Sequence, residues 1–153
     1  MNSKQKAFLD TLAWSEIGPQ MLSMTDNGYN VCVGSTPKHL ILFHDYSTHP
    51  RIRNEHLNSD AAGRYQFLGR YWEHYRIQLG LPNFAPAAQD RWAIQLIAEC
   101  GAIDEIARGD IPGALRLCRS RWASLPGAGY GQHENRMADL IDVYHKALNG
   151  YLS

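Results

Sequence analysis

Residues 4–19 read Lys-Gln-Lys-Ala-Phe-Leu-Asp-Thr-Leu-Ala-Trp-Ser-Glu-Ile-Gly-Pro. Apolar side chains recur in this stretch at helical spacing, at positions Phe8, Leu9, Leu12 and Ala13. This pattern predicts a helix over residues 4–16. Ile17-Gly18-Pro19 cannot continue a helix, so Glu16 is expected in the last turn.

Glu16 has surroundings that suit a catalytic acid. It lies beside Trp14 and Ile17 and near a helix C-terminus, whose partial negative charge disfavours ionisation. Apolar neighbours and a nearby negative charge both raise the pKa of a carboxyl group, and a glycosidase needs a carboxylic acid that is still protonated near neutral pH. The alternative is a solvated carboxylate at a helix end.

The rest of the chain is predicted to be mainly helical, with a minor β element. Residues 25–50 contain short apolar runs separated by turn residues, which predicts a small, irregular β-hairpin region. Residues 48–60 are polar and without periodicity, as in a long surface loop or the rim of a cleft. Helical patterns follow over residues 65–79, 86–100, 111–120 (with Asp110 as N-cap) and 137–149.

Length and charge limit the class of protein. A chain of 153 residues with 44% hydrophobic residues fits one compact domain, residues 1–153. Lys+Arg and Asp+Glu are both 15, so no global positive charge points to nucleic acid. The three cysteines (Cys32, Cys100 and Cys118) fit neither a disulfide framework nor a zinc site, and we expect reduced thiols of a protein made in the cytoplasm.

No other sequence feature predicts a metal, a cofactor or membrane insertion. His39, His44 and His49 recur every five residues, an interval that puts them on one face of neither a helix nor a strand, and we reject a metal site. The N-terminal apolar run is interrupted at Asp10, so we expect neither a secretory signal nor a membrane span. Nothing in the sequence predicts an oligomer, and we expect a monomer.

Several motifs occur together and in one order along nearly the whole chain. They are Leu12-Ala13-Trp14-Ser15-Glu16, Asn27-Gly28-Tyr29, residues 43–51 (Phe-His-Asp-Tyr-Ser-Thr-His-Pro-Arg), Ala62-Gly63-Arg64-Tyr65-Gln66, Gln78-Leu79-Gly80-Leu81, Gln89-Asp90, Arg108-Gly109-Asp110-Ile111 and residues 122–132 (Trp-Ala-Ser-Leu-Pro-Gly-Ala-Gly-Tyr-Gly-Gln). This colinear set resembles the lambda-type phage endolysins, a family of lytic murein transglycosylases.

The resemblance implies an α+β, mainly helical, lysozyme-like fold with a cleft between two lobes. It also implies cleavage of peptidoglycan glycan strands between N-acetylmuramic acid and N-acetylglucosamine. The family's catalytic glutamate corresponds to Glu16, which would protonate the glycosidic oxygen and then deprotonate the C6 hydroxyl that closes a 1,6-anhydro ring. One carboxyl group is sufficient for this reaction, whereas hydrolytic glycosidases ordinarily use two.

The resemblance also implies a set of sugar-binding residues. Tyr65 and Gln66 would line the cleft after a glycine that lets the backbone approach a ligand. Tyr130 would stack on a pyranose ring, and Gln132 would bond an acetamido group. Relatives often have Asp where this chain has Asn30, whose amide would bond a sugar hydroxyl. Alternatively, Tyr65 belongs to the core, Gln66 is a surface residue, and the Tyr130 segment only joins two helices.

Two other functions remain open at this point. A hydrolytic muramidase would use Glu16 and a water molecule, with Asp26 or Asp45 as helper, and a peptidoglycan-binding module would lack catalysis. For an endolysin, we expect accumulation in the host cytoplasm and release to the periplasm after a holin has permeabilised the membrane.

Overall fold

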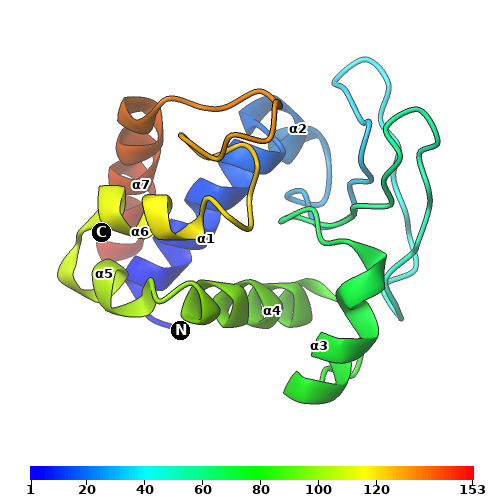
Figure 1. Cartoon of the computed structure of the whole chain (residues 1–153), viewed down its shortest axis with the longest axis horizontal. Coiled ribbons are helices and arrows are strands. Elements are labelled where there is room, and N and C mark those ends of the chain that lie inside the picture. The colour runs from blue at the N-terminus through cyan, green and yellow to red at the C-terminus, as the bar shows by residue number, and fades with distance from the viewer. The chain divides into compact units, whose positions relative to one another are not determined.

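The computed structural model describes all residues from Met1 to Ser153 (Figure 1). The chain forms two compact units, the terminal unit of residues 1–16 and 93–153 and the middle unit of residues 17–92. The boundary between residues 92 and 93 falls inside a helix. The single catalytic domain therefore stays a prediction. None of the helices is long and apolar enough to cross a membrane.

Helices account for most of the regular structure. In chain order they are α1 (Ser3–Glu16), α2 (Pro19–Met24), the 3-10 helix η1 (Gly69–Tyr71), α3 (Trp72–Leu79), α4 (Pro86–Glu99), α5 (Ile103–Arg108), α6 (Ile111–Cys118) and α7 (Met137–Leu152). The β structure consists of isolated antiparallel bridges, among them Val31 with Leu42 and Thr36 with His39. These two bridges confirm the irregular hairpin region predicted for residues 25–50.

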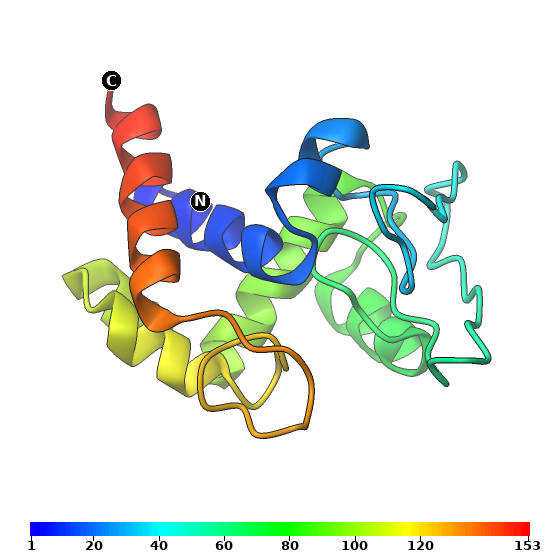
Figure 2. The ribbon, with the colours of Figure 1, turned by 90° about the horizontal axis from the view of Figure 1, so that it is seen from above.

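The terminal unit is a helical cluster in which α1 packs against α7 (Figures 1 and 2). The Tyr151 phenol donates a hydrogen bond to Asp10 Oδ2 over 2.5 Å and joins the two helices. The apolar core of this unit includes Phe8, Leu12, Ile97, Ile106, Ile111, Leu115, Leu140 and Tyr144, all at least 98% buried. Burying each such side chain contributes about 1.5–3 kcal/mol, so this packing holds the end of α1 in place.

The middle unit has an aromatic core. Phe67 and Trp92 stack with ring centroids 4.0 Å apart and planes 6° from parallel. Trp72 packs edge-on against Phe84 at 5.3 Å, and its indole nitrogen donates to Thr48 Oγ1 over 2.9 Å. Aromatic pairs in such geometries stabilise a core beyond their buried area.

The predicted helix over residues 65–79 is wrong at its start, because α3 begins at Trp72. Residues 62–67 form a tight turn, closed by two backbone hydrogen bonds between Ala62 and Phe67 of 3.0 and 2.9 Å. Gly63 and Gln66 have φ angles of +86° and +53°, which a right-handed helix cannot accommodate. The helical spacing of Tyr65 and Leu68 is therefore coincidental.

The other helix boundaries were predicted with varying accuracy. The Asp110 cap is confirmed, since its carboxylate accepts a 3.0 Å hydrogen bond from the Gly113 N–H, but α6 ends at Cys118 rather than at residue 120. Helix α7 passes through Gly150 to Leu152, because one glycine lowers helix stability only modestly. The short helices α2 and α5 were not predicted, since six residues give too little periodicity.

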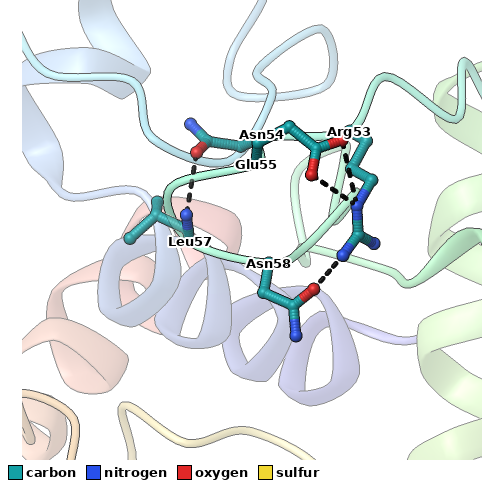
Figure 3. A network of polar contacts seen from close by, with 5 residues as sticks. All are labelled: Arg53, Asn54, Glu55, Leu57 and Asn58. Atoms are coloured by element: carbon teal, nitrogen blue, oxygen red, sulfur yellow. Dashed lines mark hydrogen bonds and ion pairs between the residues drawn. The ribbon is translucent and has the colours of Figure 1, made fainter.

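The polar segment at residues 48–60 contains a well-defined turn, shown in Figure 3. Asn54 and Ser59 exchange two backbone hydrogen bonds, and the Asn54 side chain accepts from the Leu57 N–H over 2.9 Å. Arg53 donates to both Glu55 and Asn58. The expected surface loop is thus confirmed, and its tip is closed by its own polar contacts.

Candidate active site

Glu16 is the last residue of α1, and its side chain is partly buried. The Ser124 hydroxyl, from the segment between α6 and α7, donates a hydrogen bond to Glu16 Oε1 over 3.2 Å. The Asn135 N–H donates to the Ser124 carbonyl oxygen over 2.8 Å and fastens this part of the segment. The terminal unit alone therefore positions the carboxyl group and its donor.

Three side chains form a chain of donors that ends at Glu16. Asn135 Nδ2 lies 2.9 Å from Ser15 Oγ, and Ser15 Oγ lies 2.7 Å from Ser124 Oγ. A hydroxyl has one hydrogen, and Ser124 uses its hydrogen on Glu16, so Ser15 donates to Ser124 and the Asn135 amide donates to Ser15. The donor and the acceptor of each of these three hydrogen bonds are thus assigned.

Burial raises the pKa of Glu16 from 4.5 to about 7, and the hydrogen bond from Ser124 opposes this rise. The prediction of a raised pKa is therefore confirmed, with burial as its main cause. Glu16 Oε1 accepts the Ser124 hydrogen bond, whereas Oε2 has no hydrogen-bond partner within the chain. At neutral pH a proton on Oε2 would be available to a ligand.

The predicted residues Tyr130 and Gln132 lie in the same segment as Ser124. The Tyr130 phenol donates to the Ser120 carbonyl oxygen over 3.0 Å, while 57% of the residue is exposed. Gln132 is exposed and makes no hydrogen bond within the chain. The segment is held by the Glu134 carboxylate, which accepts from two glycine N–H groups, those of Gly127 and Gly129, over 2.9 and 3.0 Å. An exposed aromatic ring and an unsatisfied amide can both contact a sugar.

Asn30 and Gln66 both belong to the middle unit. Gln66 Nε2 donates to the carbonyl oxygens of Val31 and Gly63 over 3.2 and 2.9 Å. Its Oε1 has no partner within the chain, so it is available as an acceptor. Asn30 is partly buried, and its Oδ1 accepts from the Asp26 N–H over 3.0 Å, which leaves its NH₂ group as the available donor.

Tyr65 occupies a different position, because its side chain is fully buried. Its phenol donates to Asp90 Oδ1 over 2.6 Å and accepts from Arg64 Nη1 over 2.9 Å. The Tyr29 phenol donates to the same Asp90 oxygen over 2.9 Å. A glycan contact would require the Tyr65 ring to leave the core, so we infer a positioning role for Tyr65.

The geometry of Gly63 also differs from the expectation that its backbone faces a ligand. Gly63 is buried, and a Cβ atom at this position would collide with the amide oxygen of Gln89. That oxygen accepts a 2.9 Å hydrogen bond from the Arg64 N–H. The missing side chain at Gly63 therefore makes room for Gln89. No cluster of three or more His, Cys, Asp or Glu side chains suited to a metal ion is present.

Comparison with known proteins shows the family. The family model described as Endolysin matches residues 6–150. The chain belongs to the endolysin family. Its resemblance to the lambda-type endolysins is thereby confirmed, and the protein is an enzyme of bacterial cell-wall degradation.

Three relatives define the similarity of this endolysin. The endolysin of Escherichia phage lambda is 50% identical over 151 residues, covering 96% of this chain and 92% of the lambda protein. The endolysin of Escherichia phage P2 is 48% identical over 150 residues, covering 92% of this chain and 90% of its own. A solved structure of bacteriophage lambda lysozyme complexed with a chitohexasaccharide has a TM-score of 0.86 at 49% identity, covering 96% and 95% of the two chains. The predicted lysozyme-like α+β fold is confirmed.

Sequence reasoning missed several residues of the endolysin's candidate site. Ser15 and Ser124 both stand in the quoted motifs, yet a serine carries no signal that it will donate toward a carboxyl group 108 residues away in the chain. Asn135 and Glu134 lie outside those motifs. Only the folded segment shows that their amide and carboxylate groups hold it in place.

Proposed function

We propose that this endolysin is a lytic transglycosylase that cleaves the glycan strands of peptidoglycan, with Glu16 as its catalytic acid and base. The observation that supports the proposal is a single partly buried carboxyl group with a pKa of about 7. Its hydrogen-bond partner is the Ser124 hydroxyl, which is linked through Ser15 to the Asn135 amide, and none of these groups is a second carboxylate. A carboxyl group that titrates near neutral pH can donate and then accept a proton at the working pH.

The proposed reaction has two proton transfers and consumes no water. Glu16 Oε2 donates its proton to the glycosidic oxygen as the bond from C1 of the muramic sugar breaks. The resulting carboxylate, stabilised by the Ser124 hydrogen bond, takes the proton of the C6 hydroxyl, whose oxygen attacks C1. The products are a 1,6-anhydromuramic end and a free C4 hydroxyl, and Glu16 is again protonated.

The substrate proposed is the bond between N-acetylmuramic acid and N-acetylglucosamine. Support comes from the lambda lysozyme structure, which is complexed with a chitohexasaccharide. In this chain, Tyr130 offers an exposed ring, and Gln132, Gln66 and Asn30 offer amide groups for sugar hydroxyls and acetamido groups. We propose these four residues as glycan contacts.

A hydrolytic muramidase would need a second group to activate water, and the sequence suggested Asp26 or Asp45. Asp26 Oδ2 accepts a 2.5 Å hydrogen bond from the Tyr46 phenol. Asp45 accepts from the Ser47 N–H over 2.8 Å, and this bond lowers its pKa. Both side chains are exposed and already accept hydrogen bonds. These surroundings favour the mechanism with one carboxyl group.

The test is the mass of muropeptides released from purified peptidoglycan. We expect anhydromuramic ends, each lighter by one water than the corresponding hydrolysis product. Glu16→Gln should release nothing, whereas Glu73→Gln, which changes an exposed glutamate paired with Arg76, should act as the wild type does. Reducing ends from the wild type would indicate a hydrolase, and no release at all would indicate a binding module.

We also propose that the protein accumulates in the host cytoplasm and reaches peptidoglycan after a holin has opened the membrane. The basis is membership of the endolysin family. Expression without a holin should leave cells intact, and permeabilising the membrane with chloroform should then cause lysis. Prompt lysis by this chain alone would contradict the proposal.

A further inference from the structure

Asn135 joins two parts of the terminal unit, the last turn of α1 and the segment between α6 and α7. Its backbone N–H donates to the Ser124 carbonyl oxygen over 2.8 Å. Its side-chain Nδ2 donates to the Ser15 carbonyl oxygen over 3.2 Å and to Ser15 Oγ over 2.9 Å. Asn135 therefore contacts both serines of the chain of donors that ends at Glu16.

The contact with the Ser15 carbonyl oxygen fixes which end of the Asn135 amide faces α1. A carbonyl oxygen accepts hydrogen bonds and cannot donate, so the NH₂ group of the amide must lie on this side. The opposite orientation would place two acceptor oxygens 3.2 Å apart with no hydrogen between them. The group next to the Ser15 hydroxyl is therefore a donor that cannot accept.

Two arrangements of hydrogens fit the positions of Ser15 Oγ, Ser124 Oγ and Glu16 Oε1. In the first, each hydroxyl donates toward Glu16, and Oε1 accepts whether the carboxyl group is ionised or neutral. In the second, Oε1 carries the proton and donates to Ser124, which donates to Ser15, and the Ser15 hydroxyl needs an acceptor at the far end. The Asn135 NH₂ group is not an acceptor, which disfavours the second arrangement.

We propose that Asn135 is a positioning residue, which sets the direction of this chain of hydrogen bonds and thereby places the catalytic proton on Oε2 of Glu16. Because Oε1 accepts from Ser124, the proton of the neutral carboxyl group goes to Oε2, which has no partner within the chain. The proposal rests on the proposed function only in that this proton is given to a glycosidic oxygen. The direction of the hydrogen bonds belongs to the folded protein and needs no substrate.

The charged groups nearby do not offer another route from Asn135 to Glu16. The causes of the Glu16 pKa are burial and the hydrogen bond from the neighbouring hydroxyl, and no charged side chain is among them. The charged residues on either side of Asn135 are engaged elsewhere. Glu134 accepts from two backbone N–H groups of its own segment, and Arg136 forms a 3.1 Å salt bridge with a residue of α7. A change at Asn135 should therefore reach Glu16 through the two serines.

The experiment reverses the far end of the chain with Asn135→Asp. A carboxylate has nearly the shape of the amide but accepts where the amide donates, so it should draw the Ser15 hydrogen and turn both hydroxyls away from Glu16. The Glu16 carboxylate then loses a donor and the neutral form gains an acceptor, so the pKa of Glu16 should rise by about 1–2 pH units. Carbon-13 NMR of the labelled carboxyl group measures this pKa, and Glu16→Gln identifies its signal.

The new charge could also raise the pKa of Glu16 by itself, and a Ser15→Ala background separates the two effects. Ser15→Ala breaks the chain but leaves the charge, so Asn135→Asp should there shift the pKa by less than about half as much. Asn135→Ala adds no charge and carries the test if Asn135→Asp does not fold. It should also raise the pKa of Glu16, by less than Asn135→Asp does, because the Ser15 hydroxyl is no longer held in one direction.

The control for net charge is Asn149→Asp, at an exposed position of α7, which should leave the pKa of Glu16 unchanged. Equal shifts with and without Ser15 would show that the charge acts alone and would overturn the proposal. A Glu16 pKa that stays the same in both Asn135→Asp and Asn135→Ala would overturn it as well.

The pH profile of lytic activity separates this proposal from the proposed function. With purified peptidoglycan, the pH at which activity is half lost on the alkaline side should move upward in Asn135→Asp, together with the pKa measured by NMR. A shift of the NMR pKa without a shift of the activity profile would support the hydrogen-bond direction set by Asn135 and contradict the catalytic role of Glu16.

Discussion

Replacing Glu16 with glutamine removes a titratable proton but keeps an Oε1 atom that can accept the Ser124 hydrogen bond. In the folded protein the pKa of Glu16 is about 7, against 4.5 for an ordinary glutamate. Because the folded-state pKa is the higher one, the stability that Glu16 contributes is fully present below pH 4.5 and is lost as the pH rises through about 7. One pH unit corresponds to about 1.4 kcal/mol, so the wild type should lose about 3 kcal/mol relative to Glu16→Gln across this range.

The assay is thermal or urea unfolding of both proteins at several values between about pH 4 and about pH 8. The melting temperature of Glu16→Gln should rise relative to the wild type by about 6–12 °C between these limits. The melting temperature of Glu73→Gln relative to the wild type should instead fall as the pH rises over this range, because Arg76 holds the pKa of Glu73 below its ordinary value. A difference between wild type and Glu16→Gln that stays constant with pH would refute the raised pKa.

Three other substitutions test the surroundings of the site. Ser124→Ala removes the donor that favours the Glu16 carboxylate, so the pH at which activity is half lost on the alkaline side should move upward; an unchanged pH profile would refute this role. Gly63→Ala should lower the free energy of unfolding in urea by about 1–3 kcal/mol, since φ is +86° and the new Cβ would collide with the Gln89 amide. Gly150→Ala, in an open helical position, should leave the stability unchanged or raise it. Asp90→Asn should lower the free energy of unfolding by about 1–3 kcal/mol, because the phenols of Tyr29 and Tyr65 both donate to the Asp90 carboxylate. Equal stability of the variant and the wild type would show that these two hydrogen bonds do not depend on the charge of Asp90.

The fold could be predicted from the sequence where periodicity and termination signals coincide. Helix α1 ends at Glu16 because Gly18 and Pro19 follow, and α3 ends at Leu79, before Gly80, whose φ of +62° is left-handed. The start of α3 could not be predicted, because positive φ angles in the 62–67 turn leave no trace in the hydrophobic pattern. Gln66 in particular is not a residue type that signals such a backbone.

The candidate site was predictable only in part. The motif around Glu16 identified the carboxyl group, and the local sequence indicated a raised pKa. The partners that set its hydrogen bonding, Ser124 and Asn135, are more than 100 residues away, and only packing brings them to α1. Likewise, Tyr65 is buried and its phenol donates to Asp90 of α4, a partner that no pattern near Tyr65 indicates.

The most direct test of the central claim is digestion of purified peptidoglycan in oxygen-18-labelled water. If Glu16 catalyses attack by the substrate's own C6 hydroxyl, the muropeptides at the cleavage site will carry 1,6-anhydro ends without the label. If a water molecule is the nucleophile, each new muramic end will be a reducing end that carries one labelled oxygen, and the single-carboxyl mechanism will be wrong.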